Sequence, residues 1–315
     1  MKKALLLFLL CLLLTGAACA ESVEAFGLSI DTNATVVDFD AAGVRVDDAQ
    51  ALAALVKQLP QLLEVLMFDS KLPRKDMEWL FDTYPNVFFG WTLRFDIHTV
   101  RTDATAFSTL HRSQITNKRD DYHTTNELSQ LRMCTRLKAL DLGHNAITNL
   151  DWLYDAPKLK VLILACNSIT DITPLSVQTE LEYLELFVNQ IKDISPLANL
   201  KNLKDLNLCF NQISDVTALY DLPNLERLWL TMNKEIPQEQ IDKLRELYPD
   251  AEIVVRSDGS TGDIWREDGG KLPGWRTHDR YFVIYHIFNK GEYVPWDAEV
   301  RHFDTNYAQT KFAED

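Results

Sequence analysis

The sequence repeats one line five times: LKALDLGHN at residues 137–145, LKVLILACN at 159–167, LEYLELFVN at 181–189, LKDLNLCFN at 203–211 and LERLWLTMN at 225–233. The first leucines are 22 residues apart, and the closing asparagines keep the same interval. A fixed period over five copies indicates a repeat architecture in which each unit buries its apolar face against its neighbours.

The pattern L-x-x-L-x-L-x-x-N at this period resembles the leucine-rich repeat. It is similar to the 22-residue class found in internalins and other secreted bacterial proteins, over roughly residues 115–250. The resemblance implies an α/β solenoid, a horseshoe with a parallel concave sheet. It is specific for the fold and says nothing of a ligand.

Each position of the line has a physical role. Side chains alternate along a strand, so the fourth and sixth residues face the core and the third and fifth face outward. The asparagine amide can both donate and accept, which suits it to backbone groups where the chain leaves the strand. Pro174 and Pro196 then favour a tight 3₁₀ or extended return over a long helix. The asparagines are therefore interpreted as structural.

Residues 21–110 are expected to hold longer, helix-bearing copies of the same unit. Val65 and Met67 correspond to Leu228 and Leu230, and Val37 lies about one repeat earlier. A helix is expected after an N-cap at Asp47. A helical repeat should also close the 128–256 segment, so that long repeats flank the short ones.

One more strand is expected over residues 85–95, and an irregular loop over residues 111–127. In that loop charges stand where core leucines belong. Residues 257–275 form a Gly/Asp/Ser-rich linker. Residues 276–315 are aromatic and β-prone, and predict a hairpin that turns at residues 289–292 and caps the end of the solenoid. A separate ligand-binding module is the alternative for this segment.

Residues 1–20 have the features of a secretory signal peptide: two lysines, an apolar run and an A-x-A site before Glu21. The apolar run is too short to span a membrane as a helix. These features predict a secreted or cell-surface protein. Lipid anchoring through Cys19 is the alternative, although Gly16 stands where a lipobox usually has leucine.

The formal net charge of −14 argues against nucleic acid and anionic membranes as partners, since both demand basic patches. No sequence motif of a hydrolase, a nucleotide-binding loop or a zinc site is found. We therefore expect no enzyme, no cofactor and no metal. The sequence does not predict an oligomeric state.

Outward positions of the five strands predict a binding patch for a protein or peptide. Its residues are Ile163, Tyr183, Glu185, Phe187, Asp205, Phe210, Arg227 and Trp229. Aromatic anchors inside a charged rim are typical of interfaces. Two alternatives stay open. The aromatic tail could fold back over this patch, or the solenoid could serve as a structural spacer of the cell envelope.

Overall fold

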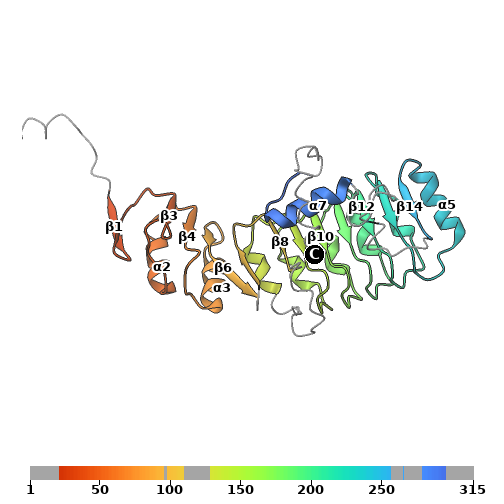
Figure 1. The fold of residues 1–315 in the computed structure, drawn as a ribbon. Helices are drawn as coiled ribbons and strands as arrows, with labels where there is room; N and C mark the ends of the chain where they lie inside the picture. Colours follow the sequence, from red (N-terminus) through yellow and green to blue (C-terminus); the bar gives the residue numbers. More distant parts are fainter. Residues whose placement is uncertain (1–20, 96–97, 110–127, 257–264, 266–278, 296–315) are drawn as a thin grey trace, which may run out of the picture. The chain divides into compact units, whose positions relative to one another are not determined.

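The computed structural model describes residues 21–95, 98–109, 128–256, 265 and 279–295. The chain divides into two compact units, of which the first ends at Thr92 and the second begins at Leu93. Figure 1 shows both units, coloured along the chain. The second unit carries the five repeats and the candidate site.

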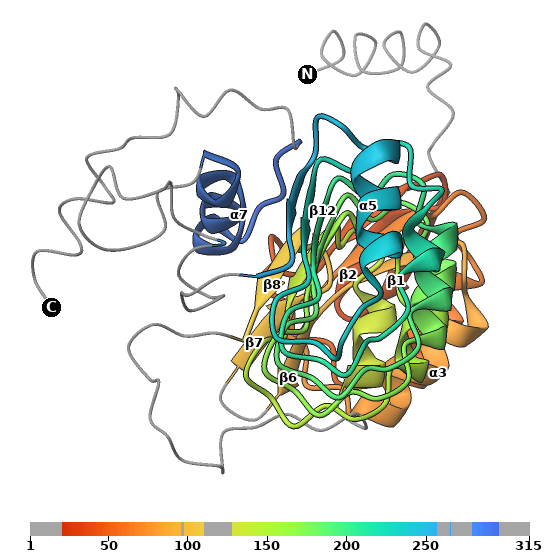
Figure 2. The same ribbon diagram turned by 90° about the vertical axis from the view of Figure 1, so that its right-hand side faces the viewer.

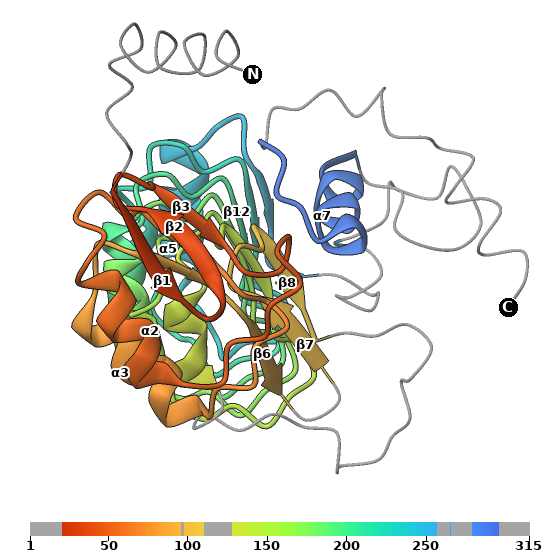
Figure 3. The same cartoon turned by 90° about the vertical axis from the view of Figure 1, so that its left-hand side faces the viewer.

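The first unit opens with an antiparallel hairpin of β1 (Ser22–Ala25) and β2 (Leu28–Asp31). Long repeats follow, with three parallel strands joined by two helices (Figure 3). Their elements are, in chain order, β3 (Val36–Asp38), α2 (Ala49–Val56), β4 (Glu64–Leu66), α3 (Arg74–Thr83) and β5 (Phe88–Gly90). Val37 pairs with Val65, as the predicted register of the long repeats requires.

The N-cap of α2 is Asp48 and not Asp47, so that prediction is wrong by one residue. The Asp48 carboxylate accepts hydrogen bonds of 2.9 Å from the backbone N–H groups of Gln50 and Ala51. A capping side chain must reach the free N–H groups two and three residues ahead. Only the residue directly before Ala49 stands at that distance.

The single strand predicted over residues 85–95 is also wrong. β5 ends at Gly90, and β6 (Thr92–Phe95) pairs with β7 (His98–Arg101) in a separate two-stranded sheet. Between them, Trp91 is fully buried and stacks on Phe89 with ring centroids 5.3 Å apart. Apolar residues continue across the break because both strands are buried, so hydrophobicity alone gives no sign of it.

The second unit is organised around a seven-stranded parallel sheet. Its order is β14-β13-β12-β11-β10-β9-β8. The strands are β8 (Ala106–Ser108), β9 (Ala139–Asp141), β10 (Val161–Ile163), β11 (Tyr183–Glu185), β12 (Asp205–Asn207), β13 (Arg227–Trp229) and β14 (Glu252–Val254). Val161 pairs with Tyr183 and Tyr183 with Asp205, so the 22-residue period of the sequence is the register of the sheet.

The returns of these repeats are 3₁₀ helices, which agrees with the 3₁₀ or extended return predicted for the repeats that carry Pro174 and Pro196. They are η2 (Ser129–Met133), η3 (Asp151–Tyr154), η4 (Thr173–Val177), η5 (Ser195–Asn199) and η6 (Thr217–Leu219). The last return is the helix α5 (Gln238–Leu247), which buries Ile241 and Leu244. The leucines of each repeat fill the space between the strands and these returns. Cys134 also packs there, and burial raises the pKa of its thiol to about 12.

The asparagine ladder is structural. The Asn189 amide donates to the carbonyls of Leu164 and Leu186, both at 3.0 Å, and its oxygen accepts from the N–H of Ile169 at 3.0 Å. Each asparagine thus ties its own strand exit to the preceding repeat. The amide satisfies backbone groups that would otherwise be buried without partners.

The hairpin predicted near the C-terminus is wrong, because the segment is the helix α7 (Asp279–Lys290). Gly291 follows with φ +69, and the N–H of Glu292 bonds to the carbonyl of Ile287 at 3.2 Å. A left-handed glycine with this bond ends a helix in a Schellman motif. The glycine that predicted a hairpin turn is therefore a helix C-cap.

The helix α7 lies on the sheet and not over the end of the solenoid. It contacts β8 and β9, on the face opposite α5 (Figure 2). The predicted signal peptide, the 111–127 loop and all of the 257–275 linker except Trp265 lie outside the described residues. Within the described ranges, no helix combines the length and the apolar character that a membrane span requires.

Candidate protein-recognition site

The candidate site is the face of the sheet formed by the third and fifth positions of the five repeats, here called the concave face. These ten residues are Ala139, Asp141, Val161, Ile163, Tyr183, Glu185, Asp205, Asn207, Arg227 and Trp229. All are buried, although they point away from the leucine core. They are covered by residues that lie far along the chain, in α7 and at Trp265.

Trp265 occupies the centre of this face. Its indole N–H lies 2.9 Å from both the Tyr183 hydroxyl and the Glu185 carboxylate. Its ring meets Trp229 edge-on at 5.7 Å, and the Arg227 guanidinium lies 4.0 Å from the ring centroid. Aromatic edges, a cation over a ring face and an acceptor for the indole N–H together fit an indole closely.

A second set of contacts is ionic. Arg227 bonds to Asp205 at 3.1 Å, to Glu252 at 3.1 Å and to the Trp265 carbonyl at 2.9 Å. From α7, Arg280 reaches the other oxygen of Asp205. Burial raises the pKa of the Asp205 carboxyl, and the two guanidinium groups oppose that shift.

Apolar packing completes the cover. Tyr281, Val283, Ile284 and Ile287 of α7 are buried in one cluster with concave-face side chains that include Ile163. Beyond the helix, the N–H of Tyr293 donates to the Thr105 hydroxyl at 2.9 Å. The helix is therefore held at both ends, by Arg280 and by Tyr293.

The residues of the predicted patch differ in their exposure to solvent. Of its eight residues, seven are buried under Trp265 and α7, and their expected exposure is wrong because the C-terminal segment folds back over them. Phe210 alone stays exposed, at 38%. A role in binding a partner stays a prediction for all eight.

Sequence reasoning missed Trp265, Arg280 and Glu252. A signal for the helix was present, since Tyr281, Ile284 and Ile287 are spaced as one helical face. The aromatic and β-branched residues of the segment favoured a strand instead. No local signal predicts that Trp265 contacts β11, some 80 residues earlier in the chain.

Among the described residues, no group of three histidine, cysteine, aspartate or glutamate side chains could hold a metal ion. Inside the concave face, the Nδ2 of Asn207 has no hydrogen-bond partner among the described residues, although its Oδ1 accepts from the N–H of Cys209. The polar side chains of this face contact Trp265 and α7.

Comparison with known proteins agrees with this architecture. The family described as Leucine Rich repeats (2 copies) matches residues 135–177, 179–221 and 201–247. The fold is a leucine-rich repeat solenoid. A search of curated proteins gives no match.

Several solved leucine-rich repeat structures resemble the chain. Internalin C2 of Listeria monocytogenes is 26% identical, over 64% of this chain and 74% of that one, with a TM-score of 0.40. A leucine-rich repeat protein of Leptospira interrogans is 27% identical, over 63% and 50%, with a TM-score of 0.41. The internalin inlF of Listeria monocytogenes is 22% identical, over 68% and 67%, with a TM-score of 0.35.

Proposed function

We propose that this protein is an exported, non-enzymatic recognition protein that binds a polypeptide segment on its concave face. Solenoids of this kind use their curved sheets as extended binding surfaces. One observation carries the proposal: the concave face already holds a polypeptide segment, its own Trp265 and α7. In this structure, a segment of the chain itself therefore occupies the proposed binding site.

The chemistry of the contacts supports recognition more than simple stabilisation. Tryptophan, tyrosine and arginine are the residues on which interfaces concentrate their energy, and they gather here around one indole. Buried ion pairs such as Arg227–Asp205 add little net stability over apolar packing. They do select a partner with matching charges.

The covalent link between the concave face and its own covering segment affects how a partner can bind there. A segment of the same chain competes at a high effective concentration, so an external segment must displace it or meet the site when it is released. A structural spacer of the cell envelope is the second candidate. The closed concave face and Cys19 near the predicted signal cleavage site favour it.

A labelled synthetic peptide of residues 260–295 tests the proposal against the full chain without residues 1–20. We expect weak binding to the wild type and at least tenfold tighter binding to the double variant Trp265→Ala/Arg280→Ala, whose own segment is weakened. Lys192→Ala, an exposed change on the 3₁₀ side, is the control and should behave as wild type. If the folded double variant does not bind the peptide, the proposed recognition by the concave face is wrong. The structural spacer is then the favoured candidate.

A further inference from the structure

Five residues in consecutive repeats share an unusual backbone conformation. Each directly precedes the asparagine of its repeat, and each has a positive φ: His144 at 57°, Cys166 at 56°, Val188 at 55°, Phe210 at 51° and Met232 at 58°. We call this row the strand-exit ridge. Among the described residues, the only other non-glycine residue with positive φ is Phe26, in the turn between β1 and β2.

The solenoid requires this backbone conformation but not these side chains. At the first four exits the N–H bonds to the next repeat, as from Val188 to the Cys209 carbonyl at 3.0 Å and from Phe210 to the Thr231 carbonyl at 2.9 Å. Glycine and asparagine adopt positive φ at low cost, whereas bulky and β-branched residues do not. Val188, Phe210 and Met232 are therefore unfavourable choices for the fold.

Burial does not offset that strain. Val188 is 41% exposed, Phe210 38% and Met232 61%. The exposed residues that follow the asparagines in the first three repeats, Ala146, Ser168 and Gln190, carry no charge. Strained positions that serve no packing role point to function. An apolar row with few charges is the composition of an interface core.

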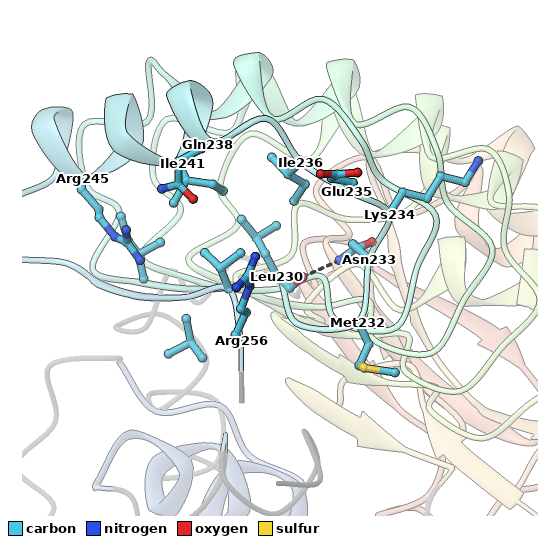
Figure 4. A pocket seen from close by; sticks show the side chains of 13 residues that line it. Leu230, Met232, Asn233, Lys234, Glu235, Ile236, Gln238, Ile241, Arg245 and Arg256 are labelled. Atoms are coloured by element: carbon cyan, nitrogen blue, oxygen red, sulfur yellow. Dashed lines mark hydrogen bonds between the residues drawn. The ribbon is translucent and has the colours of Figure 1, made fainter. Parts of the chain in front are cut away.

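The ridge runs into a pocket at its Met232 end. This pocket of about 690 Å³ is lined by Lys234, Arg245 and Arg256 and by a single carboxylate, Glu235 (Figure 4). Arg245 forms an ion pair with Asp242 at 3.9 Å, whereas no ion pair is found for Lys234 or Arg256 among the described residues. A cationic pocket on a chain of net charge −14 fits a negatively charged group.

We propose that the strand-exit ridge and this pocket form a second docking surface, for an amphipathic helix of another protein. Apolar residues of the helix would lie on Val188, Phe210 and Met232, and acidic residues at one end would enter the pocket. This goes beyond the concave site, since Val188, Phe210 and Met232 are exposed while α7 is docked, but it rests on the proposed function in polypeptide binding.

The spacing of the ridge favours a helix as its partner. Neighbouring strands are about 4.8 Å apart, so the five ridge residues span about 19 Å. An apolar helix stripe recurs about every 5.4 Å, whereas alternate residues of an extended strand recur about every 6.7 Å. The helix stays in step over more repeats. On the concave face, α7 likewise crosses the strands of this sheet (Figure 1).

The test uses the full chain without residues 1–20, immobilised and panned against a phage library of random 16-residue peptides. The ridge variant is Val188→Asn/Phe210→Asn/Met232→Asn, because asparagine tolerates positive φ. We expect enriched peptides with apolar residues at helical spacing and Asp or Glu at one end, bound at least tenfold more weakly by the ridge variant. The Tm of that variant should match or exceed that of the wild type, since strain is relieved.

Two further variants sharpen the outcome. Tyr154→Asn/Leu247→Asn removes exposed apolar side chains away from the ridge and should leave binding unchanged. Lys234→Glu/Arg256→Glu should lose the preference for acidic peptides. A ridge variant with a lowered Tm would assign the ridge a structural role and overturn the proposal.

Three binding results would also overturn it. The first is failure to enrich any peptide, or equal binding by the wild type and the ridge variant. The second is competition between the enriched peptides and the 260–295 peptide, which would place binding on the concave face. The third is ridge-dependent binding of phosphatidylglycerol vesicles alone, which would mean a membrane partner.

Discussion

At the scale of single residues, two neighbouring positions at the end of β11 face opposite sides of the sheet, and each is buried there. Leu186 faces the leucine core, while Glu185 faces the concave face, and both are fully buried. Alternation along the strand separates them, as the sequence predicted. The expectation that the outward residue meets solvent is wrong, because Trp265 donates its indole N–H to Glu185.

Replacement of Leu186 by alanine tests the core. A buried leucine that becomes alanine leaves a cavity, and the expected loss in the free energy of unfolding is about 2–5 kcal/mol. Urea unfolding followed by circular dichroism measures it. Lys192→Ala, an exposed change in the same repeat, should leave the unfolding midpoint unchanged. A loss from Leu186→Ala no larger than that from Lys192→Ala would contradict the assignment of Leu186 to the core.

At the scale of elements, α7 shows how tertiary contacts decide between helix and strand. Its aromatic and β-branched residues favour a strand in isolation. As a helix, the segment places Tyr281, Ile284 and Ile287 against the sheet and Arg280 beside Asp205. Burial of that face outweighs the local preference, as tertiary context often does.

The docking of α7 should depend on pH through His286. Burial lowers the pKa of this imidazole from its usual value of 6.5; the charge of Lys290 adds to the shift and Glu292 opposes it. The folded state then favours neutral histidine. Its contribution to stability is complete above about pH 6.5 and is lost as the pH falls through the window below that value.

A comparison with His286→Gln isolates this effect. Between pH 7.5 and pH 5.5, the urea midpoint of the wild type should fall further than that of the variant, because glutamine does not titrate. Amide hydrogen exchange in α7 should speed up in parallel in the wild type. Parallel pH profiles for the two proteins would show that His286 does not report on docking.

At the scale of the whole molecule, the proposed recognition outside the cell depends on the predicted signal peptide in residues 1–20. We predict a mature chain that starts at Glu21, since the A-x-A site at residues 18–20 fits signal cleavage better than the imperfect lipobox before Cys19. Mass spectrometry of the protein purified from its native host checks this. Diacylglycerol on Cys19 would instead place the protein at a membrane surface and favour the spacer candidate.

Much of the fold could be predicted from the sequence because repeats are local. The 22-residue period, the core leucines, the asparagine ladder and the 3₁₀ returns depend on contacts between adjacent repeats, whose residues stand at constant spacing. The long repeats of the first unit could be predicted in the same way, from residues at matching positions of successive repeats. The break between β5 and β6 at Trp91 could not be predicted in this way, because the apolar residues continue across it.

The state of the candidate site was decided only by the tertiary structure. The sequence determined which side chains stand on the concave face, since alternation along a strand is a property of the backbone. It did not determine that Trp265 and α7 cover them, since that contact joins residues some 80 positions apart. Such a contact depends on complementary shape and charge between distant segments, and no periodic pattern encodes it. The same holds for the strand-exit ridge, where positive φ follows from the three-dimensional path of the repeat.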